Sequence, residues 1–97
     1  MPKRVRHRLR IPNDVARLIR GMHPELKRKI RGALEIIVAT PDSGKALKDE
    51  LSGLRSFRVG KFRVVYKLSR RMIAIVAVGP RSKIYEETLR LIRAKSD

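Results

Sequence analysis

Hydrophobic and basic residues alternate at the start of the chain, as they do in a half-buried strand. Val5, His7 and Leu9 are interleaved with arginines up to Arg10. Pro12 ends this segment, because proline has no backbone N–H to donate to a neighbouring strand. The pattern therefore predicts a short first strand. Its arginines either contact RNA or protect an exposed sheet edge from aggregation.

Two helices are predicted after this strand. Hydrophobic residues recur at the helical period after Asn13 or Asp14, either of which can cap the helix, until Gly21 ends it. The same period continues from Pro24, a favourable first-turn residue, to Thr40. Because the link between the two segments is short, we expect an antiparallel helical hairpin.

The remainder of the chain mostly shows the patterns of strands. Residues 41–53 form a predicted connection, with Ala46, Leu47 and Leu51 as its buried positions. A last helix from about Ser82 carries its hydrophobic residues on one stripe. Between them the third of three strands is hydrophobic on both faces, as expected inside a sheet. The predicted strands are 54–59, 62–68 and 72–79.

These elements follow one another in the order βααβββα, which indicates the α+β class. We expect one domain over residues 1–97, a small antiparallel sheet packed against the two N-terminal helices, with a C-terminal helix. A chain of 97 residues is too short for two ordinary domains. Its 42% hydrophobic residues exceed what a disordered polyelectrolyte carries.

The segment 59–62, Val-Gly-Lys-Phe, predicts a two-residue hairpin that fixes how its two strands pair. Glycine at the first central position is typical of a type II′ turn. Arg58 then faces Arg63, and alternate residues share a face. The predicted core face carries Phe57, Val59, Phe62, Val64 and Tyr66. The opposite face carries Ser56, Arg58, Arg63, Val65 and Lys67.

The composition adds a strong positive charge to this picture. There are 25 Lys and Arg against 9 Asp and Glu, so the formal net charge is +16 at pH 7. Nine basic residues, all the aromatic residues and no acidic residue occur between Leu51 and Tyr85. Charge of this sign favours a polyphosphate partner, most often nucleic acid, although acidic lipid or an acidic protein satisfies the same electrostatics.

Several protein classes are excluded by what the sequence lacks. It has no cysteine, so disulfides, thiolate metal sites and a cysteine nucleophile are excluded. We expect a cytoplasmic protein with no cofactor and no metal. The basic start lacks the apolar core of a signal peptide, and the longest apolar run, 73–79, is far shorter than the ~20 residues that span a bilayer.

The facing arginines mark the candidate functional site. Like charges directly opposite each other destabilise a sheet, so stability alone does not explain them. We expect Arg81 and Tyr85 nearby, where the chain turns into its last helix. Guanidinium groups bind phosphate bidentately and a tyrosine ring stacks on an unpaired base, which predicts a phosphodiester site. In so basic a chain, the alternative is a solvated surface without function.

Two segments resemble the RelE/ParE toxin superfamily. Residues 51–66, LSGLRSFRVGKFRVVY, are similar to its L-x-G…R-v-G-x-y-R-v-i-Y segment. Residues 75–85, IVAVGPRSKIY, are similar to its final strand, which ends in V-G-x-R-x-x-v-Y. Arg63, Arg81 and Tyr85 match the RelE branch, whose members are messenger-RNA interferases that cut codons in the ribosomal A site. ParE-like members, which inhibit DNA gyrase, share the fold.

The resemblance implies a site for attack of a ribose 2′-OH on the adjacent phosphate. Arginine side chains stay charged and would stabilise the phosphorane. Lys61 is a candidate proton donor to the leaving oxygen. Tyr85 either stacks on a base or transfers a proton, and stacking is favoured because phenols ionise only in alkaline solution. The implied catalytic residues are Arg58, Lys61, Arg63, Arg81 and Tyr85. The expected RNA-binding residues are Arg55, Lys67 and Lys83.

The function that the resemblance implies is that of a toxin of a type II toxin-antitoxin system. We expect a ribosome-dependent messenger-RNA endonuclease that inhibits translation. Its expected partners are the ribosome, messenger RNA and a cognate acidic antitoxin that forms a hetero-oligomer with it, with no membrane involved. Familiar RelE members carry lysines in the first hairpin strand, where this chain has Arg55 and Arg58, so the general base is unassigned. The alternatives are a ParE-like gyrase inhibitor and a non-catalytic RNA-binding module.

Overall fold

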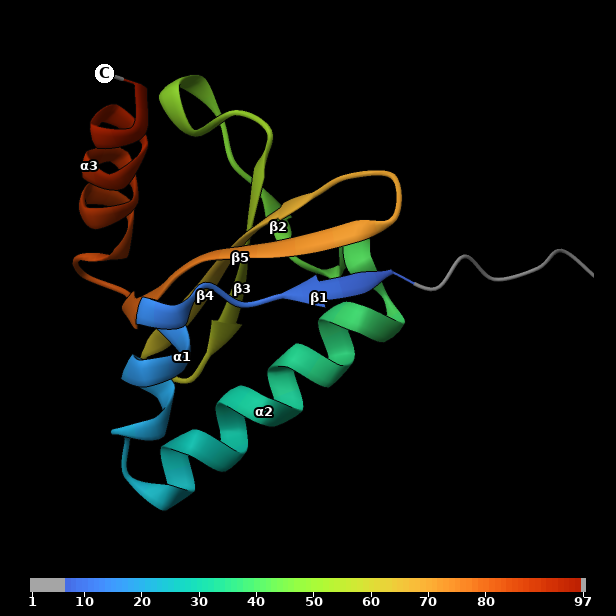
Figure 1. Cartoon of the computed structure of the whole chain (residues 1–97), viewed down its shortest axis with the longest axis vertical. Coiled ribbons are helices and arrows are strands. Elements are labelled where there is room, and N and C mark those ends of the chain that lie inside the picture. The colour runs from blue at the N-terminus through green and yellow to red at the C-terminus, as the bar shows by residue number, and fades with distance from the viewer. Residues whose placement is uncertain (1–6, 97) are drawn as a thin grey trace, which may run out of the picture.

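The structure, a computed structural model, describes residues 7–96, and Val5 of the predicted first strand lies outside them. Figure 1 shows how helices and strands follow one another along the chain. The elements are β1 (Arg8–Arg10), α1 (Asn13–Arg20), α2 (Pro24–Ala39), β2 (Lys45–Ala46), β3 (Leu54–Val59), β4 (Phe62–Leu68), β5 (Met72–Pro80) and α3 (Ile84–Ser96), with 3₁₀ turns at Pro41–Ser43 and Asp49–Leu51.

The five strands form one sheet in the order β1-β5-β4-β3-β2. Neighbours from β2 to β5 are antiparallel, whereas β1 runs parallel to β5, with Leu9 opposite Ile73. The prediction of a wholly antiparallel sheet was therefore wrong at this edge. Parallel neighbours need a long crossover, and α1, α2, β2, β3 and β4 all intervene between β1 and β5.

The predicted connection after α2 is more regular than the sequence indicated. Lys45 and Ala46 form the edge strand β2, paired with Ser56 and Arg55 of β3. Ala46 is exposed, not buried as predicted, because it lies on this two-residue edge. Leu47 is half-buried and packs, as Leu51 does, against the cluster beneath α3.

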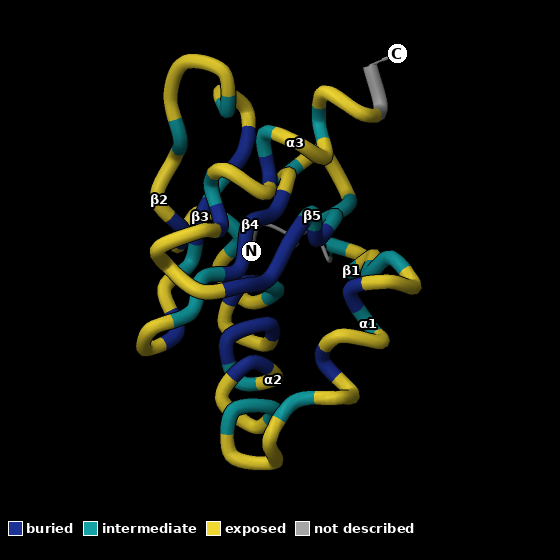
Figure 2. The backbone as a smooth tube through the Cα atoms, turned by 90° about the vertical axis from the view of Figure 1, so that its left-hand side faces the viewer, coloured by how far each residue is buried: buried dark blue, intermediate teal, exposed yellow. Residues whose placement is uncertain are grey.

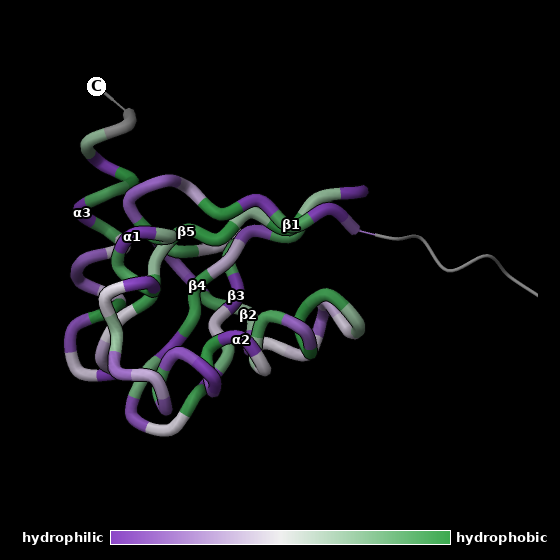
Figure 3. Tube along the Cα trace, turned by 60° about the horizontal axis from the view of Figure 1, so that its bottom comes forward, coloured by the Kyte–Doolittle hydropathy of each residue, from purple (hydrophilic) through white to green (hydrophobic). Residues whose placement is uncertain are grey.

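The helices α1 and α2 cover one face of the sheet, and α2 turns back from α1 to run diagonally across it (Figure 1). Ile30 and Ile37 of α2 are fully buried against Tyr66 and Ile75. Figure 2 shows the buried stretches of β4 and β5 in the middle of the molecule, and Figure 3 shows hydrophobic segments along β5. These four residues belong to the larger of two hydrophobic clusters among the described residues.

The two N-terminal helices begin differently, and the first does not begin as predicted. Pro12 occupies the N-cap position of α1, and Asn13 and Asp14 are already helical. The Asp14 carboxylate accepts a hydrogen bond from the Val15 N–H at 2.9 Å. In α2 the His23 Nδ1 accepts from the Glu25 N–H at 3.3 Å.

The helix α3 covers part of the opposite sheet face. Ile84 at its start is fully buried with Val65 of β4, Leu54 of β3 and Ala77 of β5. Val65 was predicted on the cationic face and lies there, beneath this helix. Because Ile84 fixes the first turn of α3, the next residue, Tyr85, is held over β3 and β4. Within the described part of the chain, no helix is long and apolar enough to cross a membrane.

Candidate phosphodiester site

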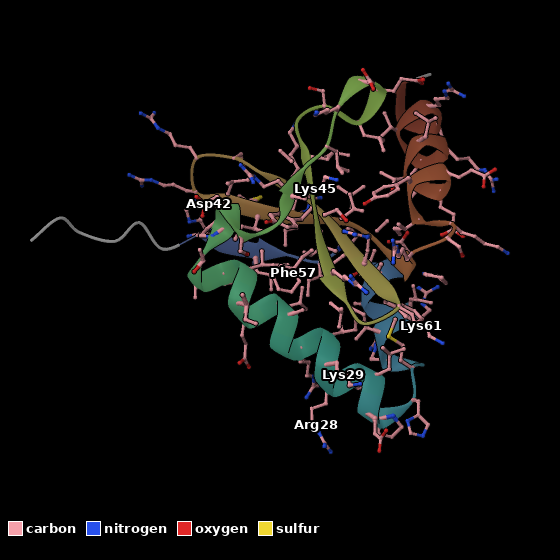
Figure 4. All side chains as sticks on the ribbon, turned by 180° about the vertical axis from the view of Figure 1, so that it is seen from behind. Arg28, Lys29, Asp42, Lys45, Phe57 and Lys61 are labelled. Carbon is pink, nitrogen blue, oxygen red and sulfur yellow. The ribbon has the colours of Figure 1, made fainter. Side chains whose placement is uncertain are left out.

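The site begins at the β3–β4 hairpin, where the predicted register is confirmed. Val59 pairs with Phe62, Arg58 with Arg63 and Ser56 with Val65. Gly60 has φ +60° whereas Lys61 does not have a positive φ, which matches a type II′ turn. Arg58 and Arg63 therefore lie on one face, opposite Phe57, which packs towards α2 (Figure 4).

A shallow groove of about 440 Å³ lies at the tip of this hairpin. The chain leaving β5 forms its far wall, and the Arg81 N–H donates to the Lys61 carbonyl at 2.8 Å. Figure 4 shows Lys61 at the hairpin tip. Of the described residues lining the groove, none is acidic. They are Arg58, Gly60, Lys61, Pro80, Arg81 and Ser82.

Arg63 lies beside this groove and is held more firmly than its neighbours. It is half-buried, whereas Arg58 and Arg81 are exposed. Its Nη1 donates to the Ser56 Oγ at 3.1 Å, and its guanidinium carbon lies 5.9 Å from the centroid of the Tyr85 ring. The Arg63 Nε is buried and has no hydrogen-bond partner among the described residues.

The five residues expected to be catalytic thus gather at one end of the sheet. Arg58, Lys61 and Arg81 line the groove, and Arg63 is the cross-strand neighbour of Arg58. Tyr85 reaches the cluster from α3, where its OH donates to the Ser56 Oγ at 3.2 Å. Three of the five residues thus line the groove, and Arg63 and Tyr85 contact each other next to Arg58.

The three residues expected to bind RNA are dispersed. Lys83 is exposed in the loop that follows Arg81. Lys67 is exposed on β4 and lines a different groove, of about 590 Å³, together with Arg10. Arg55 lies three residues before Arg58 on β3, so its side chain is on the opposite face of the sheet. There its Nη1 donates to the Gly44 carbonyl at 2.7 Å and to the Asp42 carbonyl at 3.2 Å.

Ser56 is a site residue to which sequence reasoning gave no role. It is only 1% exposed, and its hydroxyl accepts hydrogen bonds from both Arg63 and Tyr85. The predicted pairing of the two hairpin strands had placed Ser56 on the same face as Arg58 and Arg63, and this was the one indication of a role in the site. The described residues contain no group of three or more His, Cys, Asp or Glu side chains that could hold a metal ion.

Comparison with solved structures gives the same fold. The RelBE2 toxin-antitoxin complex from Mycobacterium tuberculosis contains a chain that is 25% identical, with a TM-score of 0.70, covering 79% of this chain and 100% of that chain. The archaeal RelE–RelB complex from Pyrococcus horikoshii is 22% identical, with a TM-score of 0.66 and coverage of 80% and 98%. A mutant of the E. coli toxin RelE in the free state is 14% identical, with a TM-score of 0.68 and coverage of 87% and 95%.

Comparison at the level of sequence identifies the family. Among curated proteins none matches the chain significantly. Residues 5–85, however, match the family model described as the ParE toxin of type II toxin-antitoxin systems. This match includes every residue of the candidate site. The chain therefore belongs to the ParE toxin family of the RelE/ParE superfamily and is a toxin of a type II toxin-antitoxin system.

Proposed function

We propose that this toxin is an endoribonuclease that cleaves messenger RNA in the ribosomal A site and so stops translation. The observation that carries the proposal is that Arg58 and Arg81 line one groove with no acidic residue in its lining, while Arg63 pairs with Arg58 and contacts the Tyr85 ring. Arginine binds phosphate bidentately, and an aromatic ring stacks on an unpaired base. Both features support the proposal.

The proposed reaction is an internal transesterification. The ribose 2′-oxygen attacks the adjacent phosphorus, the bond from phosphorus to the 5′-oxygen breaks, and the products end in a 2′,3′-cyclic phosphate and a 5′-hydroxyl. Arg58, Arg63 and Arg81 stabilise the charge that builds up on the phosphorane. Lys61, at the exposed hairpin tip, donates a proton to the departing 5′-oxygen.

The attacking hydroxyl passes its proton to bulk water, because no imidazole or carboxylate lines the described groove to accept it. Positioning is then the main source of rate enhancement. We propose that the ribosome supplies the remaining alignment of the substrate, so that the toxin is weak on free RNA. Exposed basic residues away from the groove, including Arg28 and Lys29 on α2 (Figure 4), are available for ribosomal RNA.

A reconstituted translation reaction with primer-extension mapping tests the proposal. We expect cuts inside codons that require ribosomes, and loss of cutting in Arg63→Ala and Arg81→Ala. Arg70→Ala is the matched control, because it removes the same charge from the exposed turn between β4 and β5. Intact messenger RNA in the presence of folded wild-type toxin contradicts the proposal.

The match to the ParE family model favours a second candidate, inhibition of DNA gyrase. A supercoiling assay with purified gyrase separates the two, since an interferase leaves supercoiling unchanged. A non-catalytic RNA-binding module differs from both, because it binds RNA in a salt-dependent manner without cleavage or gyrase inhibition.

We also propose a cognate antitoxin as the partner of this chain. Two of the similar solved structures are complexes named for a toxin and its antitoxin. With a net charge of +16, this toxin suits an acidic segment that covers the groove. We expect a small acidic protein to be encoded beside this toxin, and co-expression of the two should give a co-purifying complex without cleavage activity.

A further inference from the structure

Ser56 is an unusual residue for its place in the sheet. It is fully enclosed in the middle of β3, between β2 and β4. Among the described residues, the other buried polar side chain is Thr88, whose hydroxyl donates to the Ile84 carbonyl of its own helix at 2.7 Å. The Ser56 hydroxyl instead connects side chains from two other elements, one on β4 and one on α3.

The contacts form a closed triangle of three side chains. Arg63 Nη1 and the Tyr85 OH both donate to the one Ser56 Oγ, at 3.1 and 3.2 Å. The third side of the triangle is the guanidinium group of Arg63 against the Tyr85 ring, at 5.9 Å. Each member is thus restrained by the other two, and a single oxygen atom joins strand β4 to helix α3.

The triangle fixes the direction of the donors that Arg63 has left. A guanidinium group is planar, so a hydrogen bond to one Nη together with a contact to the Tyr85 ring restrains the orientation of the whole group. The buried Nε has no protein partner among the described residues. Arg63 as a whole is half-buried, so the part of its guanidinium group that stays exposed is held in one direction before RNA arrives, and such preorganisation stabilises a transition state more than a ground state.

We propose that Ser56 is a positioning residue, which aligns Arg63 for the reacting phosphate and sets Tyr85 beside it. This inference rests on the proposed endonuclease function. Ser56 touches neither substrate nor reacting atoms and acts through the two side chains that it holds. Without its oxygen, Arg63 keeps its charge but loses its fixed orientation.

The test compares variants of the full-length toxin in ribosome-dependent cleavage. Ser56→Ala should lower kcat about tenfold while KM changes less than about twofold, because the lost alignment matters most in the transition state. Ser56→Thr restores the hydroxyl and should recover most of kcat. Thr88→Val is the matched control, because it removes a buried hydroxyl outside the site and should leave kcat unchanged.

A second measurement follows Arg63 directly in the toxin without RNA. Nitrogen-15 NMR of the arginine side chains should show slow guanidinium rotation for Arg63 in the wild-type protein and in Ser56→Thr, and faster rotation in Ser56→Ala. If wild-type toxin cleaves no messenger, the endonuclease proposal fails while this measurement still tests the positioning contact. A Ser56→Ala variant with wild-type kcat, or with unchanged Arg63 rotation, overturns the inference.

Discussion

Arg58 and Arg63 face each other directly across the β3–β4 ladder, and both project onto the sheet face that carries Tyr85. Facing like charges destabilise a sheet by up to about 1 kcal/mol. We therefore predict that Arg58→Thr raises the free energy of unfolding by up to about 1 kcal/mol. The same substitution should lower messenger cleavage about tenfold or more, because it removes a phosphate ligand. Urea unfolding and primer extension measure the two effects.

Arg70→Thr serves as the control for this trade-off. It removes the same charge from the exposed turn after β4, where it faces no arginine across a ladder. Stability and cleavage should both stay near the wild-type values. A variant Arg58→Thr that loses stability, or that cleaves as well as the wild-type protein, contradicts the role given to the pair.

The facing pair could be predicted from the sequence because local chemistry fixes it. Gly60 sets the turn, the turn sets the register, and the register places Arg58 opposite Arg63. The predicted strands of the meander agree with the observed ones for the same reason, apart from one residue at the end of β5. The relevant interactions lie within a few residues of one another.

The remaining features depend on contacts between segments far apart in the chain. The parallel pairing of Leu9 with Ile73 is one example, since alternation predicts a strand but not its neighbour. Ser56 is another, because its place on the face of the arginines does not show that its hydroxyl meets Tyr85 of α3. Arg55 was expected at the RNA, and its partner carbonyls belong to a loop whose path the sequence did not indicate.

Tyr85 combines a ring that stacks and a hydroxyl that bonds Ser56, and two substitutions separate these parts. Tyr85→Phe keeps the ring, so we predict a loss of cleavage of only a few-fold, about what one neutral hydrogen bond is worth. Tyr85→Ala removes the stacking surface as well and should cost at least about a further tenfold. Single-turnover cleavage on programmed ribosomes measures both. Equal losses in the two variants would instead assign proton transfer to the phenol.

Arg55 anchors the segment before β2, since its Nη1 donates to the carbonyls of Gly44 and Asp42. We predict that Arg55→Ala lowers the free energy of unfolding by about 1–3 kcal/mol, the range for losing hydrogen bonds from a charged donor. Cleavage per folded molecule should change little, because the side chain belongs to the face opposite Arg58. Lys83→Ala, next to the groove, is the informative comparison. Lys83→Ala should weaken RNA binding and leave the free energy of unfolding unchanged. If Arg55→Ala weakens RNA binding instead, and leaves the free energy of unfolding unchanged, Arg55 contacts the RNA.

Position 44 needs a glycine because the Tyr66 side chain lies close to it, and not because of its backbone conformation. Its φ of −73° and ψ of 153° suit any residue, but a Cβ there would lie 2.6 Å from the Tyr66 hydroxyl oxygen and 2.8 Å from a ring carbon. That hydroxyl accepts from the Gly44 N–H at 3.0 Å and donates to the Pro41 carbonyl, so the buried ring cannot move aside without losing both bonds.

We therefore predict that Gly44→Ala lowers the free energy of unfolding by about 1–3 kcal/mol, the usual cost of overpacking. Gly32→Ala is the matched control, because no atom other than those of its chain neighbours and its own helix backbone lies within 4 Å of a Cβ at that position in α2. In a helix interior this change should raise stability by about 0.5–1 kcal/mol. Thermal and urea unfolding measure both variants. If the two alanines shift stability in the same direction, the Tyr66 contact does not determine the choice of glycine at position 44.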